Sequence, residues 1–402
     1  MSESEYKLIV HPHEGTPDVI DTQVGLEKAA QLLSKSTMPV AIDVERAVGY
    51  RYSHRAYLVQ IRREDVGTFL IDSGTLPDLS ILNEPLNNAV WILHDADQDI
   101  ASLRMCGLEI PELFDTMLAA RLLGFQRFGL AAVCEQILGV TLDKNHQSDD
   151  WSTRPLPRPW LRYAALDVEL LTDLYEKMSH SLFKANRWEW AQQEFHNILT
   201  RPTKKPDSEP WRNLRGMGKI RSRRHLAILE ELWKTRERIA AEIDLEPTRL
   251  IKNRTLVALA FNPPRTQRQF LNEQELRRPG TRKYLDEWFA AINRGKSRSE
   301  ADLPEFQRSY RHGEFPRATA WRSYEGAHAR LVHLRDAIRK VSDKLGIDYE
   351  ILIDTRIIRH IAWYEVSYQG KDLLEFLTRF GARPWQLELV FKPLEKAIKQ
   401  MP

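Results

Sequence analysis

The feature that most constrains this chain is residues 39–45, PVAIDVE, an apolar run that ends in two acids two positions apart. A run of this composition predicts a buried strand, in which side chains two positions apart lie on the same face. Asp43 and Glu45 are therefore expected side by side at the exposed end of a strand. Neighbouring carboxylates repel each other unless a cation lies between them, so the pattern predicts a divalent-metal site for phosphodiester cleavage.

The Asp-x-Glu spacing alone is not diagnostic, because it occurs at four other places. These begin at Asp167, Asp207, Asp244 and Asp348. The pair at 43–45 differs because it directly follows an apolar run of strand character, and a second such run, residues 57–61, lies close behind it. We interpret the other four occurrences as solvated turns or helix surfaces.

The first 200 of the 402 residues alternate between strand and helix patterns. Apolar runs at 39–45, 57–62 and 67–72 are separated by short polar turns, which predicts an antiparallel meander. A further apolar run at 90–93 is followed by segments of helical periodicity. Strands followed by strand–helix units predict an α/β domain over residues 1–200, with one mixed sheet covered by helices.

After residue 200 the pattern becomes helical. Residues 201–210 contain three prolines and predict a linker, and residues 297–320 predict a second one. The segments 211–296 and 321–402 are then expected to be two helical domains. An ungapped comparison of residues 242–260 with 344–362 favours two copies of one small helical module, the alternative being a shared helix-turn-helix pattern without common origin.

Composition limits the class of protein. The chain has only two cysteines, Cys106 and Cys134, and they do not form a metal-type pair. So low a count fits a reducing compartment, and no apolar run approaches the roughly 20 residues of a membrane span, so we expect a cytoplasmic protein. The formal charge of +3 is too small to imply a polyanionic partner, but residues 201–224 hold nine Lys/Arg against two acids.

Three further segments extend the metal hypothesis. Asp99 follows the apolar run at 90–93, in HDADQD, where strand ends gather functional side chains. Helix capping is the alternative role for Asp99, and Asp95 and Asp97 share it. Tyr163 and Asp167 are four positions apart in a helical pattern, so a phenol and a carboxylate lie on one helix face.

Two polar segments are candidates for nucleic-acid contact. Arg46, Arg51, His54 and Arg55 alternate with Tyr50 and Tyr52, and cations with interleaved aromatic rings can meet phosphates and bases. Residues 145–156, NHQSDDWSTRPL, form a polar loop with a tryptophan and an arginine directly before the Tyr163 helix. For both segments an ordinary solvated loop is the alternative.

The ordered set AIDVE, HDADQD, LFDTMLAARLLG and K…DW..RPL…YAALDVELL resembles the DEDD superfamily of 3′–5′ exonucleases. Tyr163 places the resemblance in the DEDDy branch, and the most similar family is ribonuclease D. The match covers about residues 20–200, and its combination of motifs is highly specific. The helical tail resembles tandem HRDC domains. The resemblance implies a ribonuclease-H-like mixed sheet flanked by helices.

Carried over residue by residue, the resemblance implies that Asp43, Glu45, Asp99, Tyr163 and Asp167 are catalytic. The four acids would hold two divalent cations, Mg²⁺ or Mn²⁺, with Asp43 bridging both. In-line attack of water on the terminal phosphodiester would then release nucleoside 5′-monophosphates. The chain departs from the family pattern at Arg46, where an apolar or aromatic residue is usual, and this departure concerns contacts with the 3′ end.

The expected partner is RNA with a free 3′ end, such as a tRNA precursor. One alternative is a DNA exonuclease, which would use the same acids. A second alternative is a protein that binds nucleic acid but has a silent catalytic site. The candidate nucleic-acid contacts are Arg46, His54, Arg55, Lys144, Trp151, Arg154, Arg215, Lys219, Arg221, Arg223 and Arg224. Cations of the tail would add affinity and salt sensitivity without sequence readout, and a solvated helix face is the alternative.

Overall fold

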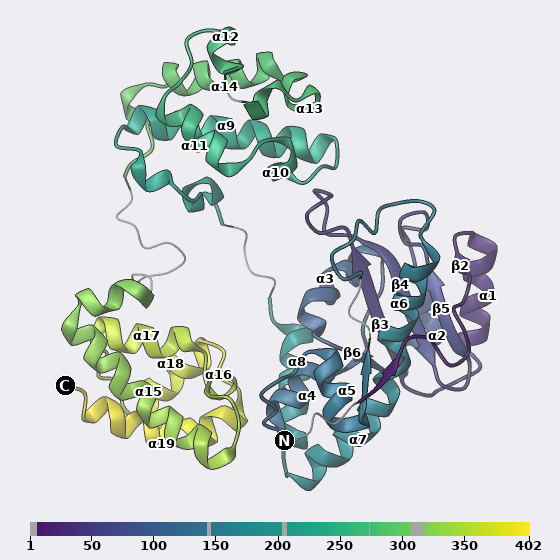
Figure 1. Ribbon diagram of the computed structural model, residues 1–402. Coiled ribbons are helices and arrows are strands. Elements are labelled where there is room, and N and C mark those ends of the chain that lie inside the picture. The colour runs from purple at the N-terminus through teal and green to yellow at the C-terminus, as the bar shows by residue number, and fades with distance from the viewer. Residues whose placement is uncertain (1–5, 143–145, 203–206, 273, 307–314, 316–317) are drawn as a thin grey trace. The chain divides into compact units, whose positions relative to one another are not determined.

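The computed structural model describes residues 6–142, 146–202, 207–272, 274–306, 315 and 318–402 (Figure 1). These residues form two compact units. The first contains the described residues of the ranges 1–47, 55–202 and 318–402, and the second contains those of 48–54 and 203–317. Among the described residues, no helix is long and apolar enough to cross a membrane.

A six-stranded mixed sheet organises the first unit, in the order β2-β5-β4-β3-β6-β7. Its strands are β2 (Val19–Ile20), β3 (Val40–Arg46), β4 (Ala56–Arg63), β5 (Gly67–Ile71), β6 (Val90–Leu93) and β7 (Glu112–Asp115). The β3, β4 and β5 strands form the predicted antiparallel meander, whereas β6 runs parallel to β3. A separate parallel pair joins β1 (Lys7–Ile9) to β8 (Val140–Leu142).

The β3 strand lies inside the sheet because its sequence is apolar on both faces for its first three residues. Val40, Ala41 and Ile42 are fully buried, and all eight residues of β4 beside it are buried. Asp43 pairs with Gln60 and Glu45 with Leu58, so the two acids are held in register by a fully buried neighbour strand. The expectation of a mixed sheet built around residues 39–45 is confirmed.

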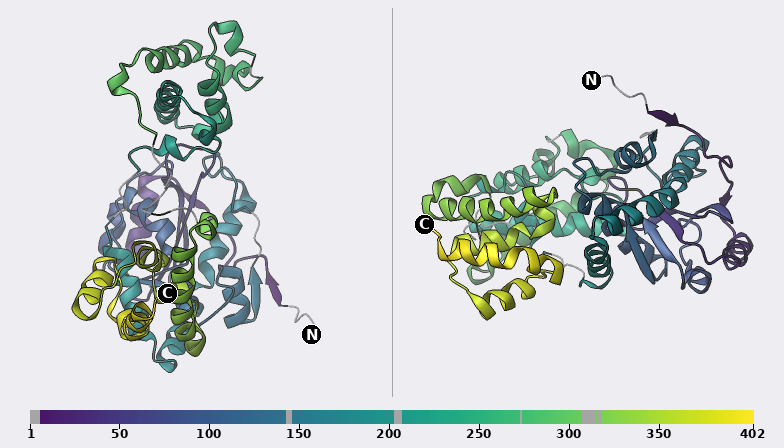
Figure 2. Two further views of the ribbon diagram at one scale, coloured as in Figure 1. Left: turned by 90° about the vertical axis from the view of Figure 1, so that its left-hand side faces the viewer. Right: turned by 90° about the horizontal axis from the view of Figure 1, so that it is seen from below.

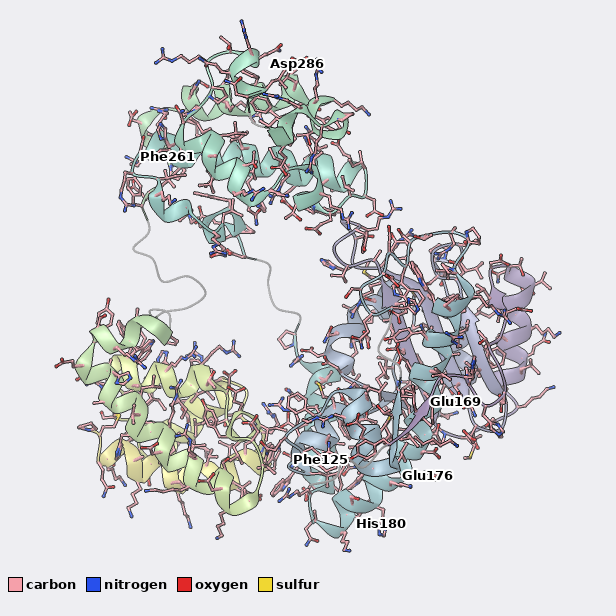
Figure 3. All side chains as sticks on the ribbon, in the orientation of Figure 1. Phe125, Glu169, Glu176, His180, Phe261 and Asp286 are labelled. Atoms are coloured by element: carbon pink, nitrogen blue, oxygen red, sulfur yellow. The ribbon has the colours of Figure 1, made fainter. Side chains whose placement is uncertain are left out.

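Eight helices of the described chain accompany the sheet. They are α1 (Gln23–Leu33), α2 (Asn83–Leu86), α3 (Ala96–Met105), α4 (Thr116–Leu122), α5 (Leu130–Leu138), α6 (Arg158–Glu169), α7 (Leu171–Lys184) and α8 (Trp188–Thr200). The α6 helix contacts β3, β4 and β5, and α7 contacts β3 and β6. Leu174 and Met178 on α7 are fully buried, while Glu176 and His180 project away from the domain (Figure 3). Helical periodicity therefore directs the apolar stripe of α7 to the core.

The second unit is helical. Its helices are α9 (Arg223–Glu242), α10 (Pro247–Leu250), α11 (Asn253–Phe261), α12 (Gln267–Phe270), α13 (Pro279–Arg282) and α14 (Leu285–Ser297). Its core includes Trp211, Leu232, Phe270 and Trp288. A Cβ added at Gly295 on α14 would lie 2.5 Å from the Ile228 Cα on α9, so this glycine permits the close approach of the two helices.

The last helices are α15 (Glu325–Leu345), α16 (Tyr349–Leu352), α17 (Thr355–Tyr364), α18 (Gly370–Arg379) and α19 (Pro384–Lys399), drawn in light green to yellow in Figures 1 and 2. In the ungapped comparison of residues 242–260 with 344–362, the first residue of α10 is aligned with the first residue of α16. The first residues of α11 and α17 are aligned in the same way. The two helical segments therefore share the order long helix, short helix, middle-length helix, which both a repeated module and a shared helix pattern without common origin would give.

A buried carboxylate joins the last helical segment to the α/β domain within the first unit. Glu194 on α8 is 5% exposed and accepts hydrogen bonds from Arg383 Nε and Trp385 Nε1, both at 2.7 Å. The rings of Trp190 and Trp385 stack beside it, with centroids 4.9 Å apart. Residues 318–402 are therefore anchored to α8 by a satisfied buried charge and a stacked aromatic pair.

Candidate active site

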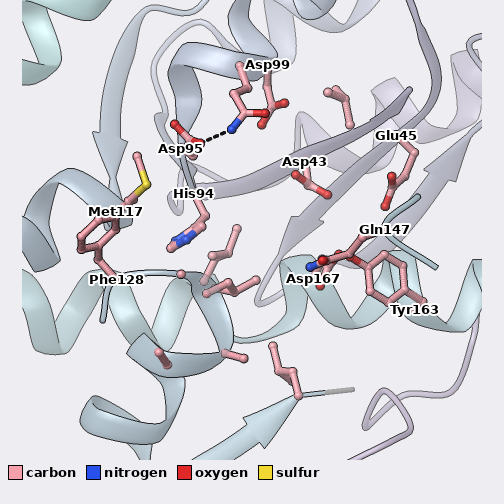
Figure 4. A pocket seen from close by; sticks show the side chains of 18 of the residues that line it. Asp43, Glu45, His94, Asp95, Asp99, Met117, Phe128, Gln147, Tyr163 and Asp167 are labelled. Atoms are coloured by element: carbon pink, nitrogen blue, oxygen red, sulfur yellow. Dashed lines mark hydrogen bonds between the residues drawn. The ribbon is translucent and has the colours of Figure 1, made fainter. Parts of the chain in front are cut away.

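Three of the predicted acids converge. Asp43 and Glu45 project from β3, and Asp167 reaches them from α6, although it lies more than 120 positions later in the chain (Figure 4). One carboxylate oxygen from each of the three residues lies within 4.8 Å of the others. Glu45 is buried, and Asp43 and Asp167 are half-buried. The structure therefore brings together the acids that the sequence placed on a strand end and on a distant helix.

Tyr163 lies one helical turn before Asp167 on α6, and its ring is buried. The Tyr163 hydroxyl makes a hydrogen bond with the Asp167 carboxylate. Burial, together with the charges of Asp167 and Glu45, raises the pKa of Tyr163 above its ordinary value. The phenol therefore stays protonated at neutral pH and acts as a hydrogen-bond donor rather than as a base.

Asp99 reaches the same cavity from α3, which begins directly after β6. A buried carboxylate fixes this turn, because Asp115 at the end of β7 accepts a hydrogen bond from the Ala96 N–H at 2.9 Å. Asp115 also caps α4, accepting from the Met117 and Leu118 N–H groups. One buried acid thus ties the starts of two helices to neighbouring strand ends, and this positions Asp99.

Asp99 does not join the cluster of three carboxylates. Its Oδ1 lies 3.2 Å from Arg46 Nη2, and Arg46 Nη1 also donates to the Gln98 carbonyl. Both side chains of the ion pair are shielded, with 19% of Arg46 and 6% of Asp99 exposed. The residue at which the sequence departs from the family pattern therefore contacts one of the four predicted acids directly.

Burial raises the pKa of each of the four predicted acids, and repulsion by neighbouring carboxylates adds to it for Glu45, Asp99 and Asp167. Desolvation raises the pKa of Asp43 to about 6. Desolvation, and secondarily the negative charge of Asp43, raises the pKa of Asp99 to about 8. The pKa values of Glu45 and Asp167 lie well above their ordinary values, chiefly because of burial and secondarily because of the Asp43 charge. Four such groups are unfavourable as bare anions, and a bound cation relieves this penalty.

The donor set fits a hard divalent cation. Asp43, Glu45 and Asp167 offer only carboxylate oxygens, which Mg²⁺ and Mn²⁺ prefer, and the spread of 4.8 Å suits oxygens around one ion. No histidine or cysteine belongs to this group among the described residues.

A cavity of about 640 Å³ contains all five predicted catalytic side chains. Its opposite wall contains His94, Met117 and Phe128, and Gln147 also lines the cavity (Figure 4). The sequence pattern did not assign these four residues to the site. Three of them lie in segments that the sequence analysis singled out: His94 directly follows the apolar run at 90–93, Met117 lies in LFDTMLAARLLG, and Gln147 lies in the polar loop 145–156.

His94 is held as a neutral imidazole. Its Nδ1 lies 2.8 Å from the Thr116 hydroxyl, which itself donates to the Leu93 carbonyl. The hydroxyl proton is therefore used, so Nδ1 carries the hydrogen and Nε2 remains an acceptor. Burial lowers the pKa of His94 to about 4, which keeps the ring uncharged at neutral pH.

Two predicted nucleic-acid contacts lie in the loop before α6, and both have partners within the fold. Trp151 is fully buried against Trp160 and Tyr163, so its ring cannot stack on a base, and this expectation is corrected. Arg154 binds both oxygens of Asp72, at 2.7 and 2.5 Å, and the Tyr57 carbonyl at 2.9 Å. Its guanidinium thus fastens the loop to the sheet. Lys144 lies outside the described residues.

The other candidate contacts are distributed over both units. Arg46 lies in the cavity, whereas the Arg55 guanidinium lies over the Tyr57 ring at 4.6 Å. His54 belongs to the second unit and is exposed.

The basic stretch of the tail is partly neutralised within its own domain. Arg223 pairs with Glu305 at 2.7 Å, Arg224 pairs with Glu300, and Arg221 donates to the Gly218 carbonyl. Arg215 and Lys219 are exposed. Of the five predicted tail cations, Arg223 and Arg224 are the two with ion pairs to described acids.

Three parts of the chain match three different protein-family models. Residues 17–182 match the model of the 3′-5′ exonuclease family, and residues 225–292 match the HRDC domain. Residues 314–398 match the 3′ to 5′ exonuclease C-terminal domain. The first helical segment is thus an HRDC domain as predicted, while the second, predicted as a further HRDC domain, matches a C-terminal exonuclease family.

Individual relatives match large parts of the chain. Ribonuclease D of Bartonella henselae is 31% identical over 255 residues, which are 62% of each protein, so the chain matches less than two thirds of that relative. Ribonuclease D of Jannaschia sp. is 31% identical over 70% of this chain and 75% of its own length. A crystal structure of a protein from Bifidobacterium adolescentis superposes with a TM-score of 0.89 at 34% identity, covering 98% of this chain and 100% of that one.

Taken with the converging acids, Tyr163 and the mixed sheet, these matches show that the chain belongs to the ribonuclease D family of 3′–5′ exonucleases.

Proposed function

We propose that this protein is a metal-dependent exoribonuclease that removes nucleoside 5′-monophosphates from the 3′ ends of structured RNAs, such as tRNA precursors. The observation that carries the proposal is the convergence of Asp43, Glu45 and Asp167 within 4.8 Å, beside the buried phenol of Tyr163. Relatives named ribonuclease D support RNA as the substrate. The free, buried cysteines Cys106 and Cys134 are consistent with action in the cytoplasm.

The acids divide the work of holding the cations. Asp43, Glu45 and Asp167 would hold one Mg²⁺ or Mn²⁺, and Asp43 with Asp99 would hold a second. Bound divalent cations supply a water of lowered pKa and neutralise charge on the phosphodiester. The carboxylates must be ionised to bind a cation, so cation binding at neutral pH releases the protons that the raised pKa values of these acids retain.

The remaining side chains orient and enclose the reacting groups. Tyr163 donates to Asp167, and its protonated hydroxyl is placed to orient the attacking water rather than to take its proton. Neutral His94 offers Nε2 as an acceptor on the opposite wall. Met117 and Phe128 give that wall an apolar surface, and the volume of about 640 Å³ admits a terminal nucleotide.

The test is one assay with four substrates. RNA and DNA of matched sequence, labelled at the 5′ end, carry either a free 3′ hydroxyl or a blocking 3′ phosphate, and are incubated with Mg²⁺, Mn²⁺ or chelator. We expect stepwise shortening of the unblocked RNA from its 3′ end with either metal, and no shortening in chelator. Asp43→Asn should reduce this activity to background. Preferred degradation of DNA, cleavage within the chain or activity in chelator would contradict the proposal.

A further inference from the structure

Arg46 occupies a position in the active site that the catalytic scheme does not explain. The register of β3 against β4 shifts between Glu45 and Arg46, where Glu45 pairs with Leu58 but Arg46 with Ala56. Such bulges re-aim side chains that strand alternation would direct elsewhere. The Arg46 side chain lines the same cavity as the acids, although strict alternation would place it on the face opposite Asp43 and Glu45.

The guanidinium of Arg46 is held by two groups of α3. Its Nη2 lies 3.2 Å from Asp99 Oδ1, and its Nη1 donates to the Gln98 carbonyl. With 6% of the Asp99 side chain exposed, water has little access to the carboxylate, and the guanidinium is the cation that faces it among the described residues. Among the four catalytic acids, Asp99 is the one with an ion pair to a described residue.

The other three acids have a different environment. Asp43, Glu45 and Asp167 bring their oxygens within 4.8 Å of one another, and Asp99 is not part of that group. A cation entering this cluster needs to displace no ion pair among the described residues. A cation entering at Asp99 has to take a carboxylate oxygen that already accepts from a guanidinium, which has the same sign of charge.

We propose that Arg46 is a built-in counter-ion that competes with a divalent cation for Asp99, so that the four acids form one strong and one weak cation position. The inference rests on the proposed function, because it concerns the same acids. The strong position is the cluster of Asp43, Glu45 and Asp167. The weak position requires Arg46 to turn away from Asp99, and 19% exposure of its side chain gives it access to solvent.

The experiment measures Mn²⁺ binding to the full-length protein without RNA, by calorimetric titration and by electron paramagnetic resonance of the free ion. Wild type should bind one Mn²⁺ tightly and a second one weakly. Arg46→Met removes the charge while keeping an unbranched side chain. Because the cation no longer has to displace a guanidinium from Asp99, we expect the weak position to tighten about ten- to a hundredfold, and the strong position to change little.

Arg127→Met is the matched control. Arg127 lines the same cavity, but its guanidinium pairs with Glu135 at 2.5 Å and 66% of its side chain is exposed. Removal of one positive charge from the cavity wall is common to both variants, whereas release of Asp99 occurs only in Arg46→Met. Asp99→Asn should abolish the weak position and preserve the strong one.

Equal affinities in Arg46→Met and Arg127→Met would overturn the inference, as would a weaker second position in Arg46→Met, which would make Arg46 a support for Asp99 instead. Unchanged Mn²⁺ affinity at both positions in Asp99→Asn would overturn the inference independently. The inference can therefore be refuted even if one of the variants misfolds. RNA shortening by wild type is measured separately. A wild-type enzyme that shortens RNA while Arg46→Met fails to tighten Mn²⁺ binding would refute this inference and leave the proposed function standing.

Discussion

The raised pKa of Asp43 predicts that the active site destabilises the metal-free protein at neutral pH. Folding raises the pKa of Asp43 to about 6, mainly by burial, from an ordinary value of 3.8. Between these two values the native state holds a proton that the unfolded state has released, so stability falls as pH rises through this window. Above about pH 6 the full penalty is present, and two pKa units correspond to about 3 kcal/mol.

Asp43→Asn removes this penalty because the amide does not titrate. In chelator, the variant should therefore gain stability relative to wild type as pH rises from 4.5 to 8. Removing one charge also relieves repulsion on Asp99 and Asp167, which adds to the gain, whereas solvent that reaches the half-buried Asp43 carboxylate reduces it. We expect a gain of about 1–3 kcal/mol. Groups such as His94 titrate in both proteins, so their effect cancels in the difference.

The assay is urea unfolding followed by tryptophan fluorescence, at pH 4.5 and pH 8, with chelator or with saturating Mn²⁺. With Mn²⁺ the order should reverse at pH 8, because only wild type keeps all three carboxylates of the strong position. A difference between the two proteins that is the same at both pH values would refute the reasoning. It would mean that Asp43 is stabilised as an anion by the protein itself, without a cation.

Two other structural assignments can be tested in the same way. Arg154→Met should destabilise the protein by about 2–4 kcal/mol in urea unfolding, because it leaves Asp72, 3% exposed, without its bidentate partner. Asp72→Asn in the same chain should restore part of the stability. An equal destabilisation in the single and double variants would contradict the pairing. The double change Arg215→Glu and Lys219→Glu should weaken binding of single-stranded RNA. It should also flatten the slope of log binding constant against log salt concentration by about 0.7 for each phosphate that is no longer neutralised. Arg223→Gln, whose partner is Glu305, should change this slope less, and an unchanged slope in the double variant would remove Arg215 and Lys219 from the RNA interface.

The sequence predicted those parts of the site that depend on local pattern. The apolar run before Asp43 specifies a buried strand, and two-residue alternation then puts Glu45 on the same face. Helical spacing likewise puts Tyr163 above Asp167. That these two pairs meet came from the resemblance to a family, since no local rule brings residues of β3 and α6 together.

What the sequence could not show are partners distant along the chain. Arg154 was predicted to contact substrate, and its bond to Asp72, 82 residues away, could not be read from the sequence. Trp151 looked like a stacking residue, yet it is buried with Trp160. The short strands β2 and β7 carry too few residues for alternation to be visible. The sequence showed that Arg46 departs from the family pattern. Its contact with Asp99 joins β3 to α3 and depends on the tertiary structure, so the sequence could not show it.

If Asp43, Glu45 and Asp167 share a bound divalent cation, anomalous diffraction at the manganese edge will locate it in crystals of the protein soaked in MnCl₂. We expect a strong peak at ~2 Å from one carboxylate oxygen of each of the three residues. Ordered manganese elsewhere, with these three carboxylates unliganded, would contradict this expectation.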